Sequence, residues 1–282
     1  MSLSQILHPP LHGALPETVI DSHAHLDLIT LGDDLDQIIK RANQNTVENI
    51  VNVGIDVTSS RAGIDIAGRY DNVFTTVGFH PNGSSRMTQS DLDQLARLAS
   101  HHKVIAVGET GLDYYRHYAT PEEQLTSLRW QLNLAAELEL PVVIHCRQAH
   151  EKMLGVLSAW VGSVSSYRNR GVIHCFSGDT ELAQRYVDLG FLISMAGSLT
   201  YPNARDLKLV ARQLPLEKLL VETDSPFLTP QKWRGSRNEP AFVTQVAQEI
   251  SRIRGIPVAE VADVTSANTI SLFRLPVVRR RK

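Results

Sequence analysis

The sequence predicts a single (β/α)8 barrel of the TIM type, and three observations support this fold class. Eight short apolar segments, mostly β-branched, alternate with longer segments of helical period. The apolar segments are continuous rather than alternating, which is typical of parallel strands covered by helices. The 282 residues, 43% of them hydrophobic, suffice for a barrel of roughly 250 residues. An open doubly wound sheet is the alternative, but its common G-x-G-x-x-G and Walker-type loops are absent from the sequence.

The expected elements follow one another along most of the chain. We expect strands at Val19–Ile20, Ile50–Val53, Val73–Val77, Val104–Val107, Val142–Ile144, Val172–Ile173, Phe191–Ile193 and Leu219–Val221. We expect helices at Asp33–Gln44, Ser59–Tyr70, Ser90–His101, Pro121–Leu138, Ala149–Trp160, Glu181–Leu189, Ala204–Gln213, Phe242–Ile253 and Val258–Phe273. Thr120 caps one helix, with proline next and Glu123 three residues after the cap. No change of composition marks a second domain, so residues 1–282 form one, with a lead-in (1–16) and a basic tail (277–282).

The composition excludes several classes of protein. Lys and Arg total 28 against 30 Asp and Glu, a net charge of −2, which argues against disorder and against a strongly basic nucleic-acid coat. Cys146 and Cys175 are too few for a disulfide framework and fit a reducing compartment; we expect both to be small buried side chains that face the helix layer. No apolar run reaches the roughly 18 residues of a membrane span, and residues 1–13 resemble no export signal. We therefore expect a cytoplasmic monomer without an obligatory protein partner.

Six side chains with metal-binding chemistry come directly after predicted strands: His23, His25, Glu109, His145, His174 and Asp224. The C-terminal ends of the strands are where barrel enzymes place their active sites. Packing does not explain the pattern, because titratable groups gathered at one mouth are costly unless they are paired or bound to metal. Imidazoles together with carboxylates suit divalent cations. The sequence therefore predicts a site for two divalent ions, with one carboxylate bridging them.

Seven motifs together give a family resemblance from about residue 19 to residue 273. They are DSHAHLD at 21–27, GFHP at 78–81, GETGLD at 108–113, PVVIHCR at 141–147, HCFSG at 174–178, ETDSP at 222–226 and RNEP at 237–240. In this order they resemble the TatD family of metal-dependent deoxyribonucleases. The resemblance implies a barrel and a two-metal hydrolase that acts on DNA ends. It also implies that His23, His25, Glu109 and Asp224 hold one ion, while Glu109, His145 and His174 hold the other. Departures are small: Thr110, Ala24 and Gln148 replace a usual isoleucine, a frequent cysteine and a frequent acid.

Four residues are candidates for catalysis of phosphodiester hydrolysis, in which two ions roughly 3.5–4 Å apart activate a water and stabilise the transition state. Asp224 is both a ligand and the expected general base. Glu222 either orients the water or supports the ligands through a hydrogen bond. Arg147 forks onto a phosphate, the alternative being a surface salt bridge. His80 contacts phosphate or protonates the leaving group, the alternative being a structural cap of its loop.

DNA is the expected partner. From Pro230 onward the chain has ten Lys and Arg against four acids. Lys232, Arg234 and Arg237 follow the eighth strand beside Trp233 and Phe227, and Tyr114 and Tyr115 follow the fourth. Cations interleaved with aromatic rings suit backbone attraction and base stacking, although a plain capping loop with solvated charges also fits. We see no groove-reading helix or finger, so we expect little sequence specificity.

Two other functions remain open at this point. One is an amidohydrolase-type metallohydrolase of a lactone, cyclic amide or phosphotriester. Many such enzymes bridge their metals with a carbamylated lysine after the fourth strand, where this chain has Glu109; Lys103 precedes that strand. The other is a protein that only binds nucleic acid or metal, which predicts a damaged ligand set. The sequence does not choose among Mg, Mn, Zn and Co, because nitrogen and oxygen ligands accept all four.

Overall fold

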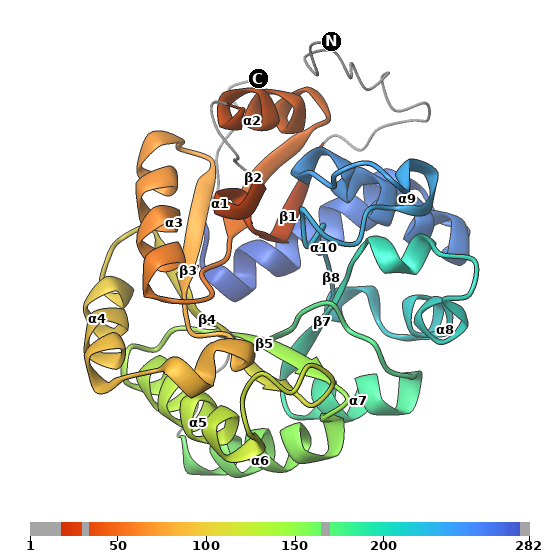
Figure 1. Ribbon diagram of the computed structural model, residues 1–282. Coiled ribbons are helices and arrows are strands. Elements are labelled where there is room, and N and C mark those ends of the chain that lie inside the picture. Colours follow the sequence, from red (N-terminus) through yellow and green to blue (C-terminus); the bar gives the residue numbers. More distant parts are fainter. Residues whose placement is uncertain (1–17, 30–33, 165–169, 277–282) are drawn as a thin grey trace.

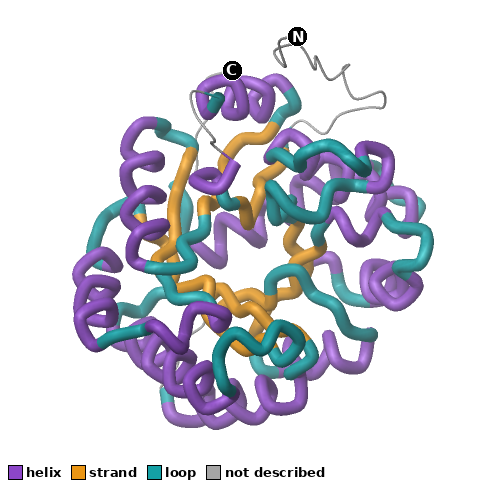
Figure 2. The backbone as a smooth tube through the Cα atoms, viewed as in Figure 1, coloured by secondary structure: helices purple, strands orange, loops and turns teal. Residues whose placement is uncertain are grey.

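Eight parallel strands, hydrogen-bonded in the order of the sequence, form one sheet that curves into a barrel. The computed structural model describes residues 18–29, 34–164 and 170–276, so the predicted lead-in and basic tail lie outside the described residues. The strands line the centre and the helices surround them (Figures 1 and 2). The prediction of a (β/α)8 barrel is confirmed. The strands are β1 (Val19–Ala24), β2 (Val47–Asn52), β3 (Val73–Val77), β4 (Val104–Asp113), β5 (Val142–Arg147), β6 (Gly171–Ile173), β7 (Phe191–Met195) and β8 (Leu219–Val221).

The helices follow the strands closely to the expected boundaries. They are α1 (Leu26–Ile29), α2 (Leu35–Gln44), α3 (Val57–Arg69), α4 (Gln89–Ala99), α5 (Pro121–Glu137), α6 (His150–Ser163), α7 (Thr180–Asp188), α8 (Arg205–Gln213), α9 (Val243–Arg254) and α10 (Val258–Phe273). Capping boxes begin α3, α4 and α5, including the predicted one at Thr120 and Glu123. The four-residue α1 has no counterpart in the prediction, because one helical turn is too short to show a period.

Three of the strands that carry predicted ligands are longer at their C-terminal ends than their apolar runs. β4 was expected to end at Val107 but reaches Asp113, because Thr110–Asp113 continue the ladder with Ile144–Arg147 of β5. β1 and β5 likewise extend into the polar residues that follow their apolar cores. As a result His23, Glu109 and His145 lie within their strands rather than in the loops beyond.

The barrel closes between β1 and β8 through side chains as well as backbone. The Asp21 carboxyl group accepts hydrogen bonds from the backbone N–H of Thr223 (2.9 Å) and from its hydroxyl (2.6 Å). Burial raises the pKa of Asp21 to about 8 despite these bonds. The N–H of Asp224, the next residue after Thr223, donates to the carbonyl of His23 at 2.9 Å. The closure therefore places the residues that follow β8 against the end of β1, so that two predicted metal ligands, His23 and Asp224, lie side by side.

The N-terminal end of the barrel is filled and covered, which leaves the other end for a site. Leu272, Phe273 and Leu275, at and after the end of α10, are buried with Ile20 and Val51 in one apolar cluster. α10 packs against β1 and β8 and lies behind the barrel centre in Figure 1. Within the described ranges, no helix is long and apolar enough to cross a membrane.

Candidate metal centre

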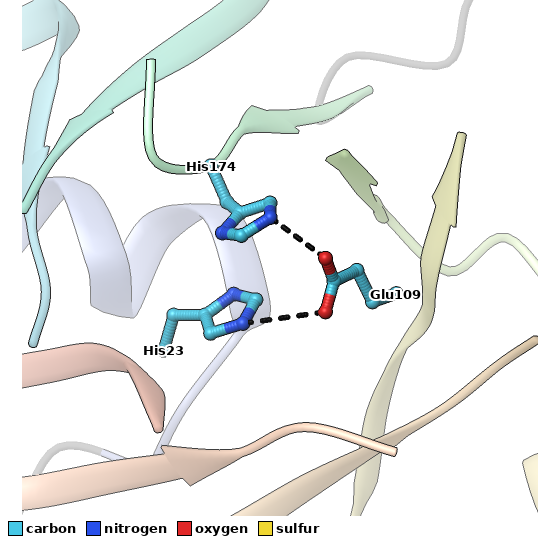
Figure 3. Close-up of side chains that lie close together, drawn as sticks. All are labelled: His23, Glu109 and His174. Atoms are coloured by element: carbon cyan, nitrogen blue, oxygen red, sulfur yellow. Dashed lines mark ion pairs between the residues drawn. The ribbon is translucent and has the colours of Figure 1, made fainter. Parts of the chain in front are cut away.

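Glu109 lies at the centre of the six predicted ligands, in the middle of β4. Its Oε1 is 2.9 Å from His145 Nδ1 and 2.8 Å from His174 Nε2. Its Oε2 is 3.6 Å from the Nε2 atoms of both His23 and His25. Figure 3 shows the carboxylate between the rings of His23 and His174, with one oxygen directed at each. The two oxygens of one carboxylate thus face two different groups of donors, which is the arrangement that a bridging ligand requires.

The first group consists of His23, His25 and Asp224. The Nε2 atoms of the two histidines are 3.2 Å apart, and Asp224 Oδ1 lies 3.7 Å from the first and 3.5 Å from the second. His25 Nδ1 is 3.1 Å from the carbonyl of Val53, which can only accept, so Nδ1 carries the hydrogen. The neutral His25 ring therefore directs a lone pair at carboxylate oxygens and at a second imidazole. A cation satisfies such a set of converging lone pairs.

The second group consists of Glu109, His145 and His174, with His145 Nδ1 3.3 Å from His174 Nε2. Behind His145, Asp113 Oδ2 is 3.2 Å from Nε2. Behind His174, Glu222 Oε1 is 3.6 Å from Nδ1 and accepts a 2.6 Å hydrogen bond from the backbone N–H of Cys175. Glu222 is fully buried and is not among the described residues that line the cavity. Of its two expected roles, the structure favours support of His174 over orientation of a water.

The electrostatics of the centre are those of a cation site that holds protons when no metal is bound. Burial alone would raise the pKa of Glu109, but the charge of His174 and hydrogen bonds from His145 and His174 hold it well below its usual value. Burial alone would lower the pKa of His174, but Glu109 and Glu222 raise it well above its usual value. Proton and metal therefore compete for the same lone pairs.

Two backbone features shape this end of the barrel. A Cβ on Gly78, in the Gly-Phe-His-Pro motif, would overlap the backbone of Gly108, so only glycine lets β3 and β4 approach where Glu109 is presented. Asp224 has φ 53°, in the left-handed region, which an aspartate tolerates better than most residues. Asn238 holds this turn, because its side-chain amide donates to the carbonyls of Thr223 (2.8 Å) and Phe227 (2.5 Å). The local strain is maintained by these contacts.

His80 has the capping role that was the alternative for it, and its ring also faces the ligands. Its Nδ1 accepts a 3.0 Å hydrogen bond from the N–H of Asn82 and caps the short helix that follows β3. Because Nδ1 accepts, the hydrogen of the neutral ring is on Nε2, which lies 3.3 Å from Glu109 Oε1. Burial is the main cause that lowers the pKa of His80, so the neutral ring is favoured. His80 therefore presents a hydrogen-bond donor to the site rather than a lone pair.

A cavity of about 1290 Å³ opens above the centre. It is lined by His25, His80, Glu109, His145, His174 and Asp224, together with Arg86, Arg116, Arg147, Tyr118, Phe227 and other residues. The guanidinium of Arg147 lies 3.9 Å from the centroid of the Tyr115 ring. Tyr118 is 62% exposed and Phe227 is 52% exposed, and the Phe227 ring centroid is 6.1 Å from that of His25. The mouth thus combines cations and accessible aromatic rings with the ligand cluster.

The loop after β8 only partly matches the expectation. Lys232, Arg234 and Arg237 are not among the described residues that line the cavity. Arg237 donates to Asp34 Oδ2 at 2.6 Å, and Arg234 lies over the ring of Tyr201. The Trp233 ring stacks on Phe242, with centroids 5.5 Å apart. For these residues the structure favours the capping loop that was the alternative; Phe227 alone of this set faces the mouth.

The expectation for the two cysteines is half right. Cys146 is buried in the core and lies 3.7 Å from the hydroxyl of Tyr186 on α7, so it does contact the helix layer. Cys175 is only half-buried and, like Cys146, is among the residues that line the cavity. Strand alternation was the wrong guide there, because β6 ends at Ile173 and Cys175 has φ 45°.

Sequence reasoning missed the residues that hold the ligands from behind. Asp113 lies in one of the seven motifs but has no predicted role, although its carboxylate contacts His145. Glu239 accepts three hydrogen bonds of 2.7–2.9 Å from Arg41 on α2, and its neighbour Asn238 holds the Asp224 turn. A signal for Asp113 was present, because it lies four residues after Glu109 on the same side of an extended strand. Arg41 and Glu239 are 198 residues apart, and no local pattern connects them.

We call the six predicted ligands (His23, His25, Glu109, His145, His174 and Asp224) the donor cluster. The barrel and its donor cluster together define a metal-dependent hydrolase. The family described as TatD related DNase matches residues 20–274, and the chain belongs to this family, so the resemblance seen in the motifs is confirmed. The metal-dependent hydrolase YabD of Bacillus subtilis is 37% identical over 91% of this chain and 99% of its own. The 3'-5' ssDNA/RNA exonuclease TatD of Salmonella typhimurium is 33% identical over 91% and 99%. The crystal structure of the TatD homologue YJJV from Escherichia coli K12 superposes with a TM-score of 0.86, at 32% identity over 92% and 98%.

Proposed function

We propose that this protein is a divalent-metal-dependent nuclease that hydrolyses phosphodiester bonds at DNA ends with little sequence specificity. The observation that carries the proposal is the combination, in one mouth, of a bridged donor cluster, the Arg147–Tyr115 stack and the exposed ring of Phe227. A phosphate needs positive charge, and an unpaired base needs a flat apolar surface; this mouth offers both beside the ligands. The name of the Salmonella relative, an exonuclease of single-stranded DNA and RNA, supports the same class of substrate.

The residues present fit two cations, one on each side of Glu109. His23, His25 and Asp224 would hold one with Glu109 Oε2, and His145 and His174 the other with Oε1. When bound, two such ions supply positive charge to the phosphate and make a water more acidic. Mg, Mn, Zn and Co all suit this mixture of nitrogen and oxygen ligands.

The protein's own residues then take distinct roles. Asp224, whose side chain is 13% exposed at the mouth, accepts the proton of the attacking water. Arg147 donates to the non-bridging phosphate oxygens, with its guanidinium held flat by Tyr115. The Nε2–H of His80 donates a further hydrogen bond to the phosphate. Glu222 keeps His174 in place from behind.

The charge of the mouth makes nucleic-acid binding depend on metal. Five carboxylates and three arginines line the cavity, which gives a net charge of −2 when the histidines are neutral. Two divalent ions reverse the sign. At a pH where these histidines are neutral, a polyanion is therefore repelled by the metal-free protein and attracted by the loaded one.

The small-molecule amidohydrolase is the weaker candidate, because of where Lys103 lies. Its ammonium donates to the carbonyls of Tyr70 (3.3 Å), Asp71 (3.0 Å) and Val73 (3.2 Å), at the N-terminal end of the barrel. It is unable to bridge metals at the opposite end. The ligand set is also complete, which argues against a protein that only binds.

The test is reconstitution of metal-free protein with each cation, followed by assay on end-labelled single-stranded DNA, duplex DNA and RNA. We expect ladders that shorten from one end with Mn²⁺ or Mg²⁺ and no cleavage without metal. Arg147→Ala and Phe227→Ala are expected to weaken DNA binding while metal content stays unchanged. Arg185→Ala on α7 and Leu209→Ala on α8, which remove an exposed cation and an exposed apolar side chain away from the mouth, are the matched controls. Turnover of lactones or phosphotriesters with no cleavage of any polynucleotide would refute the proposal.

A further inference from the structure

Asp113, the last residue of β4, connects the metal centre to the mouth through one buried carboxylate. It is 1% exposed. Its Oδ2 is 3.2 Å from His145 Nε2. Its Oδ1 accepts hydrogen bonds of 2.9 Å from the backbone N–H groups of both Tyr115 and Arg116. One oxygen therefore contacts His145 of the donor cluster, and the other holds the turn that follows β4.

We propose that Asp113 is a positioning residue that fixes the tautomer of His145. A neutral imidazole carries one hydrogen, on Nδ1 or on Nε2, and only a nitrogen without hydrogen binds a metal. Of the two nitrogens of His145, Nδ1 faces Glu109 and His174. A carboxylate only accepts, so Asp113 places the hydrogen on Nε2 and leaves the Nδ1 lone pair for the ion.

The other oxygen sets the position of a substrate-facing group. By holding the turn at residues 115–116, Asp113 orients the Tyr115 ring, against which the Arg147 guanidinium lies. Arg147 is itself two residues after His145 on β5. The Asp113 carboxylate thus positions both His145, a predicted metal ligand, and Arg147, the cation two residues after it.

The backbone of Asp113 is held independently of its side chain, which makes the side chain testable. Its N–H donates to Gln124 Oε1 at 2.8 Å, and Gln124 Nε2 donates to its carbonyl at 3.0 Å. Gln124 is buried on α5. A substitution that keeps the shape of residue 113 therefore leaves the end of β4 in place.

Asp113→Asn is the informative change. The amide oxygen is expected to keep the position of Oδ1, where it accepts from two N–H groups, which puts the NH₂ opposite His145 Nε2. Two donors then face each other, so the ring moves its hydrogen to Nδ1 and turns an N–H toward the centre. We expect the affinity for one of the two ions, measured by calorimetry with Mn²⁺, to fall about 10–100-fold. Asp179→Asn at the start of α7, where asparagine caps equally well, is the matched control and leaves both affinities unchanged.

A double-mutant cycle with His145→Ala separates positioning from a general structural effect. If Asp113 acts through His145, Asp113→Asn adds no further loss of affinity in the His145→Ala background. An equal loss in both backgrounds, or no loss in either, overturns the proposal. Nitrogen NMR of the His145 ring in the wild-type protein loaded with Zn²⁺ gives the tautomer directly, whether or not the variant folds. Hydrogen on Nε2 is expected, and hydrogen on Nδ1 contradicts the proposal. None of these measurements uses nucleic acid, so they stand whatever the substrate.

Discussion

Metal binding by this protein is expected to release protons, and the number follows from the donor cluster. In the metal-free protein, burial alone would lower the pKa values of His25, His145 and His174, but the neighbouring carboxylates outweigh burial and raise all three. Burial lowers the pKa of His23, and that of Glu109 is also lowered. At pH 6, below the usual pKa of a histidine, these three rings therefore hold a proton that the metal must displace, while the other two groups have none to lose.

The sign and size of the pH effect follow from this count. A ring whose pKa is raised is protonated up to a higher pH, so metal affinity increases with pH and levels off only above the raised values. Each displaced proton weakens binding tenfold per unit fall in pH, about 1.4 kcal/mol. Three protons give about 4 kcal/mol, or roughly 1000-fold, for loading both ions between pH 6 and pH 5.

Calorimetry in buffers of different ionisation enthalpy measures the protons released at a fixed pH. We expect about three per chain at pH 6 for the wild-type protein, about two for His145→Gln, and no change for the control His102→Gln, which alters a histidine outside the centre. Release of no protons at pH 6, or an affinity that is the same at pH 6 and pH 8, would refute the assignment of these rings as ligands.

Three further outcomes are expected. Glu109→Gln removes the bridging charge, so tight binding of both ions and hydrolysis are lost and excess Mn²⁺ restores neither; metal analysis after dialysis that still finds both ions bound would contradict this. Arg41→Leu leaves the buried Glu239 carboxylate unpaired and lowers the free energy of unfolding by about 3 kcal/mol, which urea titration measures. The further change Glu239→Leu removes the unpaired charge and is expected to recover most of that loss. A double variant that is no more stable than Arg41→Leu alone would count against the pairing. Burial raises the pKa of the Cys146 thiol to about 12 and that of the Cys175 thiol well above its usual value. A thiol reagent at pH 8 is therefore expected to modify neither cysteine in the native protein and both after denaturation. A native thiol that reacts quickly would contradict this expectation.

Much of the donor cluster was predictable because the fold does the positioning. In a barrel of parallel strands, every residue at a strand's C-terminal end reaches the same mouth. Residues as distant as His23 and Asp224 therefore meet without any sequence signal that relates them directly. Recognising eight apolar runs and the polar residue after each was enough to place the ligands near one another.

The parts that were not predictable are those fixed by contacts across the sequence. The ladder between β4 and β5 extends β4 through Glu109 to Asp113, and an apolar pattern stops before such polar residues. The turn that carries Asp224 depends on Asn238, and Glu239 beside it depends on Arg41 from α2. Cys175 faces the cavity because β6 is only three residues long, so alternation along the strand had already ended.

The central claim is that two cations bind on either side of Glu109. Crystals soaked in Mn²⁺ and measured at the manganese absorption edge test it most directly. We predict two anomalous peaks, one among His23, His25, Asp224 and Glu109 Oε2, the other among His145, His174 and Glu109 Oε1. A single peak, or peaks that leave Glu109 outside both coordination shells, would contradict the account.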